Sequence, residues 1–589
     1  MTASTRHIVL FATLLVSAMA AAQVQTAIPT QHNEATVAQL QAEMAAGRLT
    51  SEQLTQEYIS RILALDQSGP GVNAVIELNP DALVMARNAD ALRRRGMVLG
   101  PLHGIPVLLK DNIDTGDKMQ TSAGSFALVG TPALHDSTVA ANLRAGGAVI
   151  LGKTNLSEWA NFRSFESISG WSGRGGQTHN PYGIDRNPCG SSSGSGAATS
   201  ANFAAVSFGS ETDGSIVCPA NANGVVGIKP TVGLVSRAGV VPISHTQDTV
   251  GPHGRTVADA AAALGVIQSR TFDGRDPATG GVPLGWQGTG KTRPARIPTD
   301  YTQFVNANGL HGARIGVTRA GLNGFDPLVP TPPVVLDAFE NAIDALTTAG
   351  ATVIDLDAQG FSFPSADGEL LVLLFEFRND VQAYFGTRLG VPVAGGTLQS
   401  AIDFNNAHAD VEMPFFNQDI FDLANALEPG PDDPQPIFGG LTYNQALAID
   451  HDAGANGIDL AISQFHLDAV VSATDNPAWA TDLLYGDHFI FGTSSLAAGP
   501  GYPIVQVPAG IVFGVPLGIS FFGPPFSEPT LIKLASGFEA ATQVRAQNLP
   551  TFAATVPFNN IQGTTVKRPV RRAAPPTSKA PSRKMAHHL

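Results

Sequence analysis

Two short segments of this 589-residue chain contain residue types that could carry out acyl transfer. Ser215 follows a glycine within residues 209–220, where successive backbone N–H groups can point the same way. Such a group of N–H donors can bind the oxyanion of a tetrahedral intermediate. Because a serine is a weak nucleophile until a base activates it, the chemistry needs a second side chain.

Lys110 is a candidate for that base. It ends a short apolar strand, residues 104–110, where partial burial would desolvate the ammonium group and lower its pKa. On spacing alone, the simpler interpretation is favoured, namely a lysine exposed at the end of a strand. A catalytic role for Lys110 therefore needs support from other segments.

The most unusual composition is in residues 190–196, which contain four serines and three glycines. A flexible linker could have this composition. However, the run leads directly into a predicted Ala-rich helix at 197–205 and a strand at 206–209. A linker would not lie between packed elements, so we interpret the run as part of a site.

Taken together, these segments resemble the amidase-signature family. That family pairs a glycine–serine run with a downstream G-T-D-x-G-G-S-I-type segment and has a lysine upstream in a G-I-P-type strand. The matching segments here are residues 104–112, 190–194 and 209–220, and Ser191 lies 24 residues before Ser215, as in the family. Further similarity at 224–231, 501–510 and 526–528 extends the resemblance over roughly residues 35–550.

The resemblance implies a Ser-Ser-Lys triad and no cofactor. Ser215 would be the nucleophile that forms an acyl-enzyme, Ser191 would relay protons from a cis peptide, and a neutral Lys110 would be the base. The oxyanion hole would consist of the backbone N–H groups of Thr212, Asp213, Gly214 and Ser215.

Some positions differ from the commoner family pattern, which has Asp at Glu211, Gly at Asp213, Arg at Val217 and Gly at Ser193. The variant segment 211–220 is similar to that of bacterial peptide amidases, and His179–Tyr182 also suits that branch. The resemblance therefore favours C-terminal peptide amides or small carboxamides as substrates.

Residues 190–194 also match G-x-S-x-G, the nucleophile elbow of α/β-hydrolases. An esterase of that type would use Ser192 as nucleophile, with a base chosen from His253, His466 and His488. The elbow requires an apolar strand directly before it, and residues 185–188 are poor strand formers.

Two further interpretations are a binding protein without activity and an amidotransferase-A-like subunit. The intact Ser215, Ser191 and Lys110 oppose the first. Residues 147–154 match the P-loop pattern, but their apolar middle predicts a buried strand instead. The histidines are scattered, without HExxH or paired-cysteine spacing, so no metal site is predicted.

The segments that position these residues alternate between strands and helices. Strands are predicted at 72–78, 104–110, 148–151, 206–209, 314–317, 352–356, 468–472, 503–507 and 515–522, and helices at 81–95, 137–145, 197–205, 256–266, 334–349 and 528–545. This order predicts a single large three-layer α/β/α domain with a mixed central β-sheet, residues 35–560. Residues 274–310 are predicted as a surface insertion, and residues 404–440 as a lid or pocket wall.

The ends of the chain predict export. Residues 1–22 resemble a signal peptide, with an apolar run too short to span a membrane and A-x-A sites after it; an uncleaved anchor is the alternative. Residues 23–34 are predicted as an unstructured leader and 561–589 as a basic disordered tail. We therefore expect a periplasmic or secreted protein without stable membrane insertion.

The overall charge argues against a nucleic-acid partner. The formal net charge is −14, and it becomes −21 without the seven Lys and Arg residues of the tail. A body this acidic repels phosphate, so the expected partner is a small-molecule or peptide amide substrate. The two cysteines, Cys189 and Cys218, are predicted to be free buried thiols, although an oxidising compartment would permit one bridge.

Overall fold

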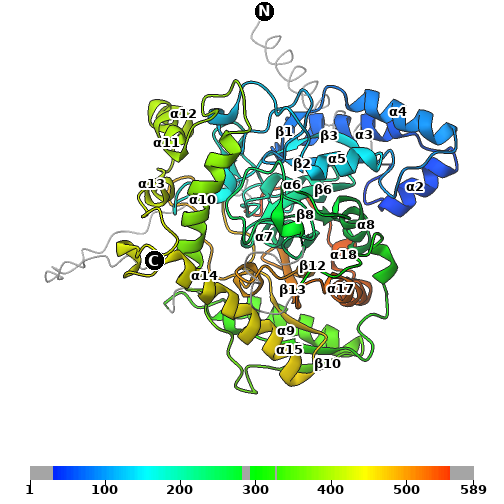
Figure 1. The fold of residues 1–589 in the computed structure, drawn as a ribbon. Helices are drawn as coiled ribbons and strands as arrows, with labels where there is room; N and C mark the ends of the chain where they lie inside the picture. The colour runs from blue at the N-terminus through cyan, green and yellow to red at the C-terminus, as the bar shows by residue number, and fades with distance from the viewer. Residues whose placement is uncertain (1–30, 281–291, 325–327, 557–589) are drawn as a thin grey trace, which may run out of the picture. The chain divides into compact units, whose positions relative to one another are not determined.

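The computed structural model describes residues 31–280, 292–324 and 328–556. Its central feature is one eleven-stranded sheet with helices packed around it (Figure 1). In spatial order the strands are β1 (Val75–Leu78), β3 (Val149–Thr154), β2 (Pro106–Lys110), β6 (Val206–Glu211), β8 (Thr249–Gly254), β7 (Val226–Lys229), β12 (Ile504–Val512), β13 (Val515–Phe522), β11 (Ala469–Ala473), β9 (Arg314–Val317) and β10 (Thr352–Asp355). A separate small sheet pairs β4 (Trp171–Ser172) with β5 (Gly176–Gln177).

The sheet is mixed, as predicted. β2 runs parallel to β3 and β6, and β9 runs parallel to β10 and β11, whereas the strands from β6 to β11 pair antiparallel. Because β2 and β6 are parallel neighbours, their carboxyl ends lie at the same edge of the sheet. Lys110 ends β2 and Glu211 ends β6, so this edge brings the lysine close to the segment that contains Ser215.

Two sets of helices pack on the sheet and complete the predicted three layers. Helices α5 (Thr138–Ala145), α8 (Val257–Ile267), α17 (Glu528–Thr542) and α9 (Pro333–Thr348) contact one another in that order. Helices α6 (Ser193–Ser200) and α7 (Val217–Ala222) contact each other and the central strands. The remaining helices near the sheet are α2 (Val37–Ala45), α3 (Ser51–Leu65), α4 (Ala82–Arg94), α16 (Ser495–Ala498) and α18 (Val544–Gln547).

A group of helices between β10 and β11 has a hydrophobic core of its own. It contains α10 (Glu369–Phe385), α11 (Leu398–Ala407), α12 (Ala409–Glu412), α13 (Asp419–Asn425) and α14 (Tyr443–Asp452), whereas α15 (Leu460–Phe465) packs against β9 and β11 of the sheet. Helix α10 contacts α11, α13 and α14, and its Phe385 packs edge-on against Trp159. Within residues 404–440, which belong to this group, a small pocket of about 160 Å³ is lined by Phe415, Phe416, Asn417 and Asp419. The pocket at Ser215, described below, is lined by Leu373 of α10 and by none of residues 404–440.

Parts of two segments predicted to lie outside the packed domain are held by contacts. Of the predicted leader, residues 31–34 are described, and Glu34 accepts hydrogen bonds from Arg545 at 2.7 and 2.9 Å and from Asn202. The described part of the predicted insertion is packed in places, since Tyr301 is 1% exposed and Arg293 donates to main-chain carbonyls. The predicted signal peptide and basic tail lie outside the described residues. Within the described ranges, no helix has the length and apolarity needed to cross a membrane.

Candidate active site

Lys110 is completely buried at the end of β2. Its Nζ donates to Ser191 Oγ at 2.8 Å, to Ser210 Oγ at 3.0 Å and to the Ser210 carbonyl at 3.1 Å. Burial lowers the pKa of Lys110 to about 7, although the charges of Asp248 and Glu211 oppose this shift. The interpretation of Lys110 as an exposed lysine is therefore wrong, and a large fraction of this amine is neutral near pH 7.

Ser191 reaches Lys110 from a loop with a cis peptide bond between Gly190 and Ser191. The loop is fixed on both sides, since the Ser191 carbonyl accepts from Ser157 N at 3.1 Å and Ser192 N donates to the Ser215 carbonyl at 3.1 Å. Helix α6 begins directly after it, at Ser193. The main-chain hydrogen bond from Ser192 joins the Ser191 loop to the Ser215 loop.

The Ser215 loop presents main-chain donors to a pocket. Residues 212–215 follow β6 and all line this pocket. Among the described residues, none of their four N–H groups has a hydrogen-bond acceptor. Gly214 has φ +77°, a left-handed conformation that favours glycine. Buried Glu211 fixes the end of the loop by accepting from Ile216 N at 2.6 Å and Val217 N at 3.0 Å.

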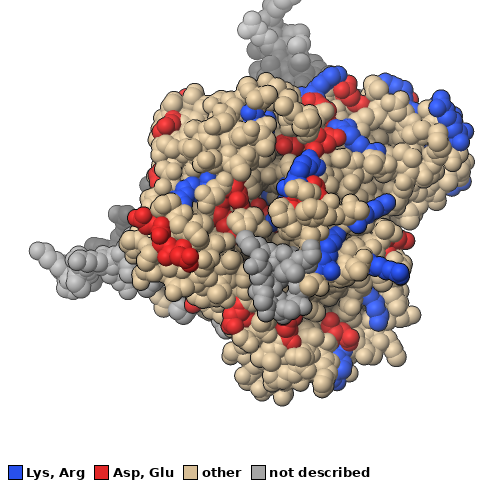
Figure 2. Space-filling model, viewed as in Figure 1, with Lys and Arg blue, Asp and Glu red and all other residues tan. Residues whose placement is uncertain are grey.

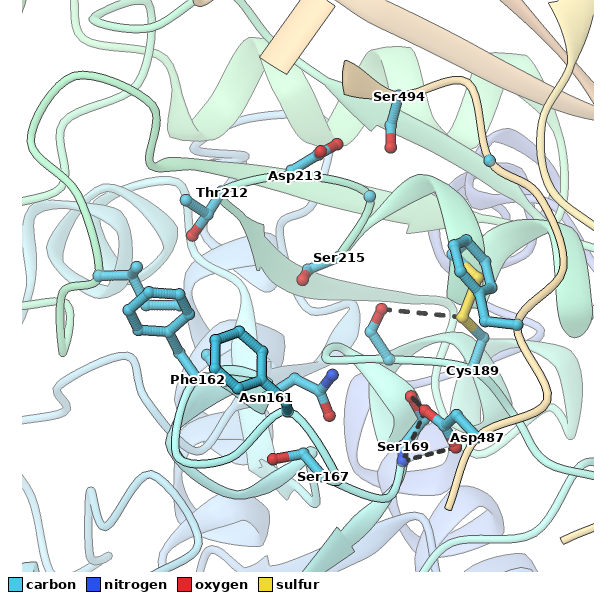
Figure 3. Close-up of a pocket in the computed structure, with 18 of the residues that line it drawn as sticks. Asn161, Phe162, Ser167, Ser169, Cys189, Thr212, Asp213, Ser215, Asp487 and Ser494 are labelled. Atoms are coloured by element: carbon cyan, nitrogen blue, oxygen red, sulfur yellow. Dashed lines mark hydrogen bonds between the residues drawn. A yellow bond between two sulfur atoms is a disulfide. The ribbon is translucent and has the colours of Figure 1, made fainter. Parts of the chain in front are cut away.

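The pocket has a volume of about 440 Å³ and includes Ser215 and Asn161 in its wall (Figure 3). Three acidic residues, Asp213, Glu166 and Asp487, line it, and no Lys, Arg or His does so among the described residues. Asp487 accepts hydrogen bonds from Ser169, and burial raises the pKa of this carboxyl group to about 6.

The aromatic part of the pocket wall comes from two segments without a recognisable motif. These residues are Phe162, Phe165, Trp479, Tyr485 and Phe489. Sequence reasoning did not identify them, because apolar and aromatic residues in loops resemble ordinary core positions. A cluster of aromatic and acidic residues at 479–489 is the one signal that could have indicated a pocket.

Cys189 and Cys218 form a disulfide, so the prediction of two free thiols is wrong. The fold brings their Cα atoms to 5.9 Å, within the range that a bridge requires. The sequence could not show this distance. Both cysteines line the pocket, and the bridge links the loop of Ser191 to helix α7 behind Ser215.

The surroundings of Ser192 do not fit a nucleophile elbow. Its side chain is fully buried and is absent from the pocket wall; its Oγ donates to the Ser210 carbonyl at 3.0 Å and accepts from Ser210 N at 3.2 Å. Within the described residues no histidine bonds to Ser192, and His253 Nε2 pairs with the Ile216 carbonyl at 3.0 Å. The P-loop pattern is also a false match, because residues 149–154 of it form the buried strand β3.

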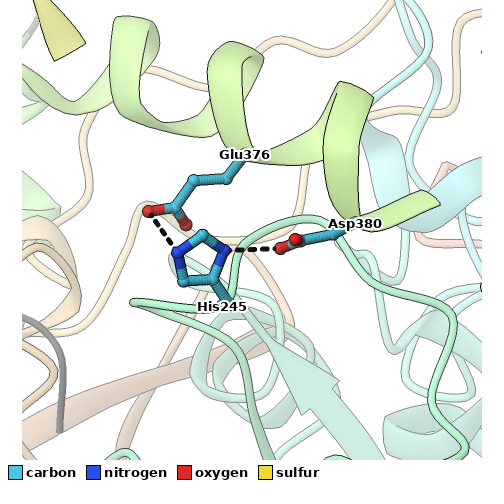
Figure 4. A group of neighbouring side chains, drawn as sticks. All are labelled: His245, Glu376 and Asp380. Carbon is cyan, nitrogen blue, oxygen red and sulfur yellow. Dashed lines mark hydrogen bonds and ion pairs between the residues drawn. The ribbon is translucent and has the colours of Figure 1, made fainter. Parts of the chain in front are cut away.

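A His–Glu–Asp cluster joins the loop before β8 to helix α10 (Figure 4). His245 Nδ1 lies 2.8 Å from Asp380, and its Nε2 lies 3.5 Å from Glu376. Burial opposes protonation, but the hydrogen bond to Asp380 and the two carboxylate charges outweigh it and raise the pKa of His245. Each ring nitrogen thus faces its own carboxylate, which is the arrangement of an imidazolium ion pair.

Comparison with known proteins agrees with this geometry. The family model for amidases matches residues 53–408. A probable amidase of Arabidopsis thaliana is 40% identical, with 91% of this chain and 96% of that protein covered. The glutamyl-tRNA(Gln) amidotransferase A subunit of Salinispora arenicola is 32% identical over 86% of this chain and 96% of its own length.

Among solved structures, the native peptide amidase from Stenotrophomonas maltophilia superposes with a TM-score of 0.78 at 46% identity. The match covers 89% of this chain and all of that structure. A peptide amidase in complex with the inhibitor chymostatin matches at 45% identity with the same TM-score. The sequence motifs, the mixed sheet and these matches lead to one conclusion: this chain belongs to the amidase-signature family and is an amide hydrolase.

Proposed function

We propose that this amide hydrolase works through Ser215, Ser191 and Lys110, and that its substrates are C-terminal peptide amides or small carboxamides. The observation that carries the proposal is the 2.8 Å hydrogen bond between the buried Lys110 amine and Ser191 Oγ. A lysine whose pKa is lowered to about 7 is a competent base near neutral pH.

In the first half of the reaction, neutral Lys110 takes the proton of Ser191 as Ser191 takes the proton of Ser215. Ser215 Oγ attacks the amide carbonyl carbon, and the resulting oxyanion accepts hydrogen bonds from the N–H groups of residues 212–215. The proton then returns through Ser191 to the leaving nitrogen, the carbon–nitrogen bond breaks and ammonia leaves. Ser215 remains as an acyl ester.

In the second half, a water molecule loses a proton along the same path and attacks the ester. The acid product leaves, and Ser215 regains its proton. In the structure Ser191 Oγ is hydrogen-bonded to Lys110 Nζ, and no hydrogen bond joins it to Ser215 Oγ. The proposal therefore requires Ser215 to approach Ser191 when a substrate binds, as catalytic hydrogen bonds commonly tighten in the substrate complex.

The charge of the pocket supports an uncharged leaving group. Asp213, Glu166 and Asp487 line the pocket, without a cation among the described lining residues. A substrate with a free carboxylate next to the scissile bond would be repelled, because the pocket offers no positive partner. A terminal carboxamide is neutral, and the similarity to peptide amidases agrees with this substrate class.

We also infer that the protein is exported. The signal-like residues 1–22 motivate this inference. The Cys189–Cys218 bridge supports it, because disulfides persist mainly in oxidising compartments.

The 32% identity to amidotransferase subunits favours a second candidate, a role in a complex acting on charged tRNA. That role would need a basic surface for the nucleic acid. Figure 2 shows acidic and basic side chains mixed on the displayed face, most of which is uncharged, and the net charge is −14. We therefore favour the hydrolase acting alone.

The proposal is tested by a release assay with the purified mature protein. Peptide amides, aryl amides and ethyl esters are supplied, and free ammonia, amine or alcohol is measured. We expect the wild type to release ammonia from peptide amides and Ser215→Ala to release none, whereas Ser192→Ala should stay active. Turnover by Ser215→Ala would contradict the assignment of the nucleophile. So would a Ser192→Ala variant that has a native circular dichroism spectrum but no turnover.

A further inference from the structure

The side chain of Asp213 attaches the loop of residues 212–215 to two helices. Figure 3 shows its carboxylate directed away from Ser215. Asp213 Oδ2 accepts from Ser495 Oγ, at the start of α16, at 2.5 Å. The carboxyl group of Glu369, the first residue of α10, also lies within hydrogen-bonding distance of Asp213. Through this one side chain the loop is joined to both α16 and α10.

The contact between Asp213 and Glu369 joins two acids and therefore needs a proton. Asp213 Oδ1 is buried, and no N–H or hydroxyl group of the described residues donates to it. Glu369 Oε1 is occupied by Gln247 Nε2, which donates to it at 2.7 Å. Two ionised carboxylates only accept hydrogen bonds, whereas a protonated carboxyl group donates a strong O–H bond to a carboxylate. The two acids can pair only if one of them is protonated.

The surroundings of Glu369 favour its neutral form. Burial, followed by the negative charges of Asp213 and of Asp450 in α14, raises the pKa of Glu369 well above its ordinary value. The hydrogen bond from Gln247 and the position at the start of a helix both oppose this rise. Asp450 is itself fully buried, neither of its carboxyl oxygens has a hydrogen-bond partner, and burial raises its pKa to about 8.

The surroundings of Asp213 show which of the two acids keeps the charge. Its charge acts on two further buried acids, Glu211 of β6 and Asp475 after β11. It also acts on one cation, the buried Lys229 at the end of β7. This cation and the hydroxyl of Ser495 stabilise a carboxylate on Asp213. The negative charge therefore belongs on Asp213 and the proton on Glu369.

We propose that Glu369 is a positioning residue of the oxyanion hole, which keeps its proton at neutral pH and donates it to Asp213. This inference rests on the proposed function. With the proton in place, two O–H donors hold the Asp213 side chain, and the N–H groups of residues 212–215 stay directed at the pocket. Without it, two negative charges would be in contact and would push the loop away from α10. The commoner family pattern has glycine at position 213, which cannot make this contact.

The kinetic test compares two replacements of Glu369. Glutamine keeps the shape of a protonated glutamate and can donate an N–H to Asp213, whereas alanine removes the donor. The control is Asp367→Ala, which removes an exposed carboxyl group two residues earlier. With N-acetylphenylalaninamide as substrate, Glu369→Ala should lower kcat by about 10- to 100-fold, as expected for displaced oxyanion donors. Glu369→Gln and Asp367→Ala should stay within about threefold of the wild type, and KM should change by less than about threefold in all three variants.

Infrared spectroscopy detects the proton itself. A protonated carboxyl group has a C=O stretching band at higher frequency than the amide I band, and an ionised group does not. In D₂O at pH 7, the difference spectrum of wild type minus Glu369→Gln should contain a positive band of this kind. Bands from other buried acids, such as Asp450, are common to both proteins and cancel. The difference spectrum of wild type minus Asp367→Ala should lack the band.

A wild type minus Glu369→Gln spectrum without this band would overturn the inference and leave the proposed function intact. So would a Glu369→Gln variant that is as slow as Glu369→Ala despite a native circular dichroism spectrum. A raised KM with unchanged kcat in Glu369→Ala would assign the residue to substrate binding and would also overturn the inference. If the wild type releases no ammonia from the peptide amide, the proposed function fails, and the infrared band still reports on the carboxyl pair.

Discussion

The amine of Lys110 is surrounded by neutral oxygen atoms. Its three partners are the hydroxyl of Ser191 and the hydroxyl and carbonyl of Ser210, and none is a carboxylate. Asp248 and Glu211 act on it only through their charge. Desolvation of the ammonium group therefore dominates, and the pKa of Lys110 falls to about 7 instead of the ordinary 10.5.

This pKa predicts the pH dependence of activity. In the proposed mechanism the base is the neutral amine, so kcat/KM for a peptide amide such as N-acetylphenylalaninamide should rise about tenfold per pH unit below about pH 7 and level off above it. The measurement is a pH–rate profile from pH 5 to 9 with ammonia release as readout. A profile that is flat between pH 5 and 7 would argue against Lys110 as the base.

The variant Lys110→Met tests separately what the amine contributes to catalysis and to the stability of the fold. Lys110→Met should lower kcat by about 10²–10⁴-fold, the range for loss of a general base. Between pH 7 and 10.5 the unfolded wild type binds more protons than the native state, so its stability should rise with pH over that window. Urea titrations at pH 7 and pH 10 should show this rise in the wild type, and any equal rise in Lys110→Met would exclude Lys110 as its source.

At the scale of elements, the disulfide connects the two segments that carry the serines. Cys189 precedes the Ser191 loop, and Cys218 lies in α7, just after Ser215. The two cysteines are 29 residues apart in the sequence. The bridge limits the freedom of this part of the unfolded chain and fixes the separation of the two loops in the folded state.

Replacing both cysteines, Cys189→Ser with Cys218→Ser, should lower the free energy of unfolding by about 3–4 kcal/mol, because a closed loop of this length loses that much chain entropy when cross-linked. Guanidinium titrations measure the change. Dithiothreitol should lower the stability of the wild type by a similar amount and leave the double variant unaffected. An effect of dithiothreitol on the double variant would show that the bridge is not its target.

His245 connects helix α10 to the loop before β8. The loop also contains Asp248, which accepts a hydrogen bond from Thr212 Oγ1, and Ile243, which lines the pocket as Leu373 of α10 does. Since the pKa of His245 is raised in the folded state, its ion pairs stabilise the protein fully below about pH 6.5. This contribution is lost as the pH rises through the raised pKa.

His245→Gln should therefore destabilise the protein by up to about 1 kcal/mol at pH 5.5, a value limited by partial solvent exposure. The histidine side chain is 41% exposed. At pH 9 the variant and the wild type should unfold at the same temperature. The same difference in Tm at both pH values would mean that packing, and not charge, is the source.

The sequence predicted the limits of strands and helices well where apolar and turn residues followed a regular pattern. Strands 314–317 and 515–522 have the predicted limits, since short apolar runs between turn residues predict strands well. Helix α6 begins at Ser193, four residues before the predicted start at 197. Its first turn consists of serine and glycine, which have low helix propensity, so the sequence did not indicate a helix there. Helix α10 was not predicted, since residues 370–377 are apolar except for Glu376 and no helical period stands out there.

The residues of the candidate site were likewise predictable only where they lie in a sequence motif. Lys110, Ser191 and residues 212–215 lie in motifs and could be named in advance. Asn161 and the disulfide could not, because each depends on distances between segments that only the folded chain sets.

At the scale of the whole molecule, an ion pair joins the two ends of the described domain. Glu34, before α2, binds Arg545 of α18 through two hydrogen bonds, and Arg545 also donates to main-chain carbonyls at Ser200 and Gly224. Burial raises the pKa of Glu34, but Arg545 outweighs this effect and the pKa is lowered overall. The pair therefore stabilises the fold above the ordinary pKa of glutamate, and this contribution is lost as the pH falls.

Glu34→Gln should lower the free energy of unfolding by about 1–3 kcal/mol at pH 7, because Arg545 is left buried without its counter-charge. The difference from wild type should shrink below about pH 4 as Glu34 itself becomes protonated. Chemical denaturation at pH 7 and pH 3.5 measures both values, and a difference that grows in acid would be the opposite of this expectation.

The enclosure of Lys110 also has a consequence for chemical selectivity. A free amine is itself a good nucleophile towards activated carbonyl groups, so an accessible neutral lysine beside an acyl-enzyme would be acylated and the enzyme would inactivate itself. Lys110 has no exposed surface, and Ser191 Oγ is bonded to its Nζ. The amine can thus exchange protons through a neighbouring hydroxyl while the electrophile, and any amine-modifying reagent in the solvent, has no route to its lone pair.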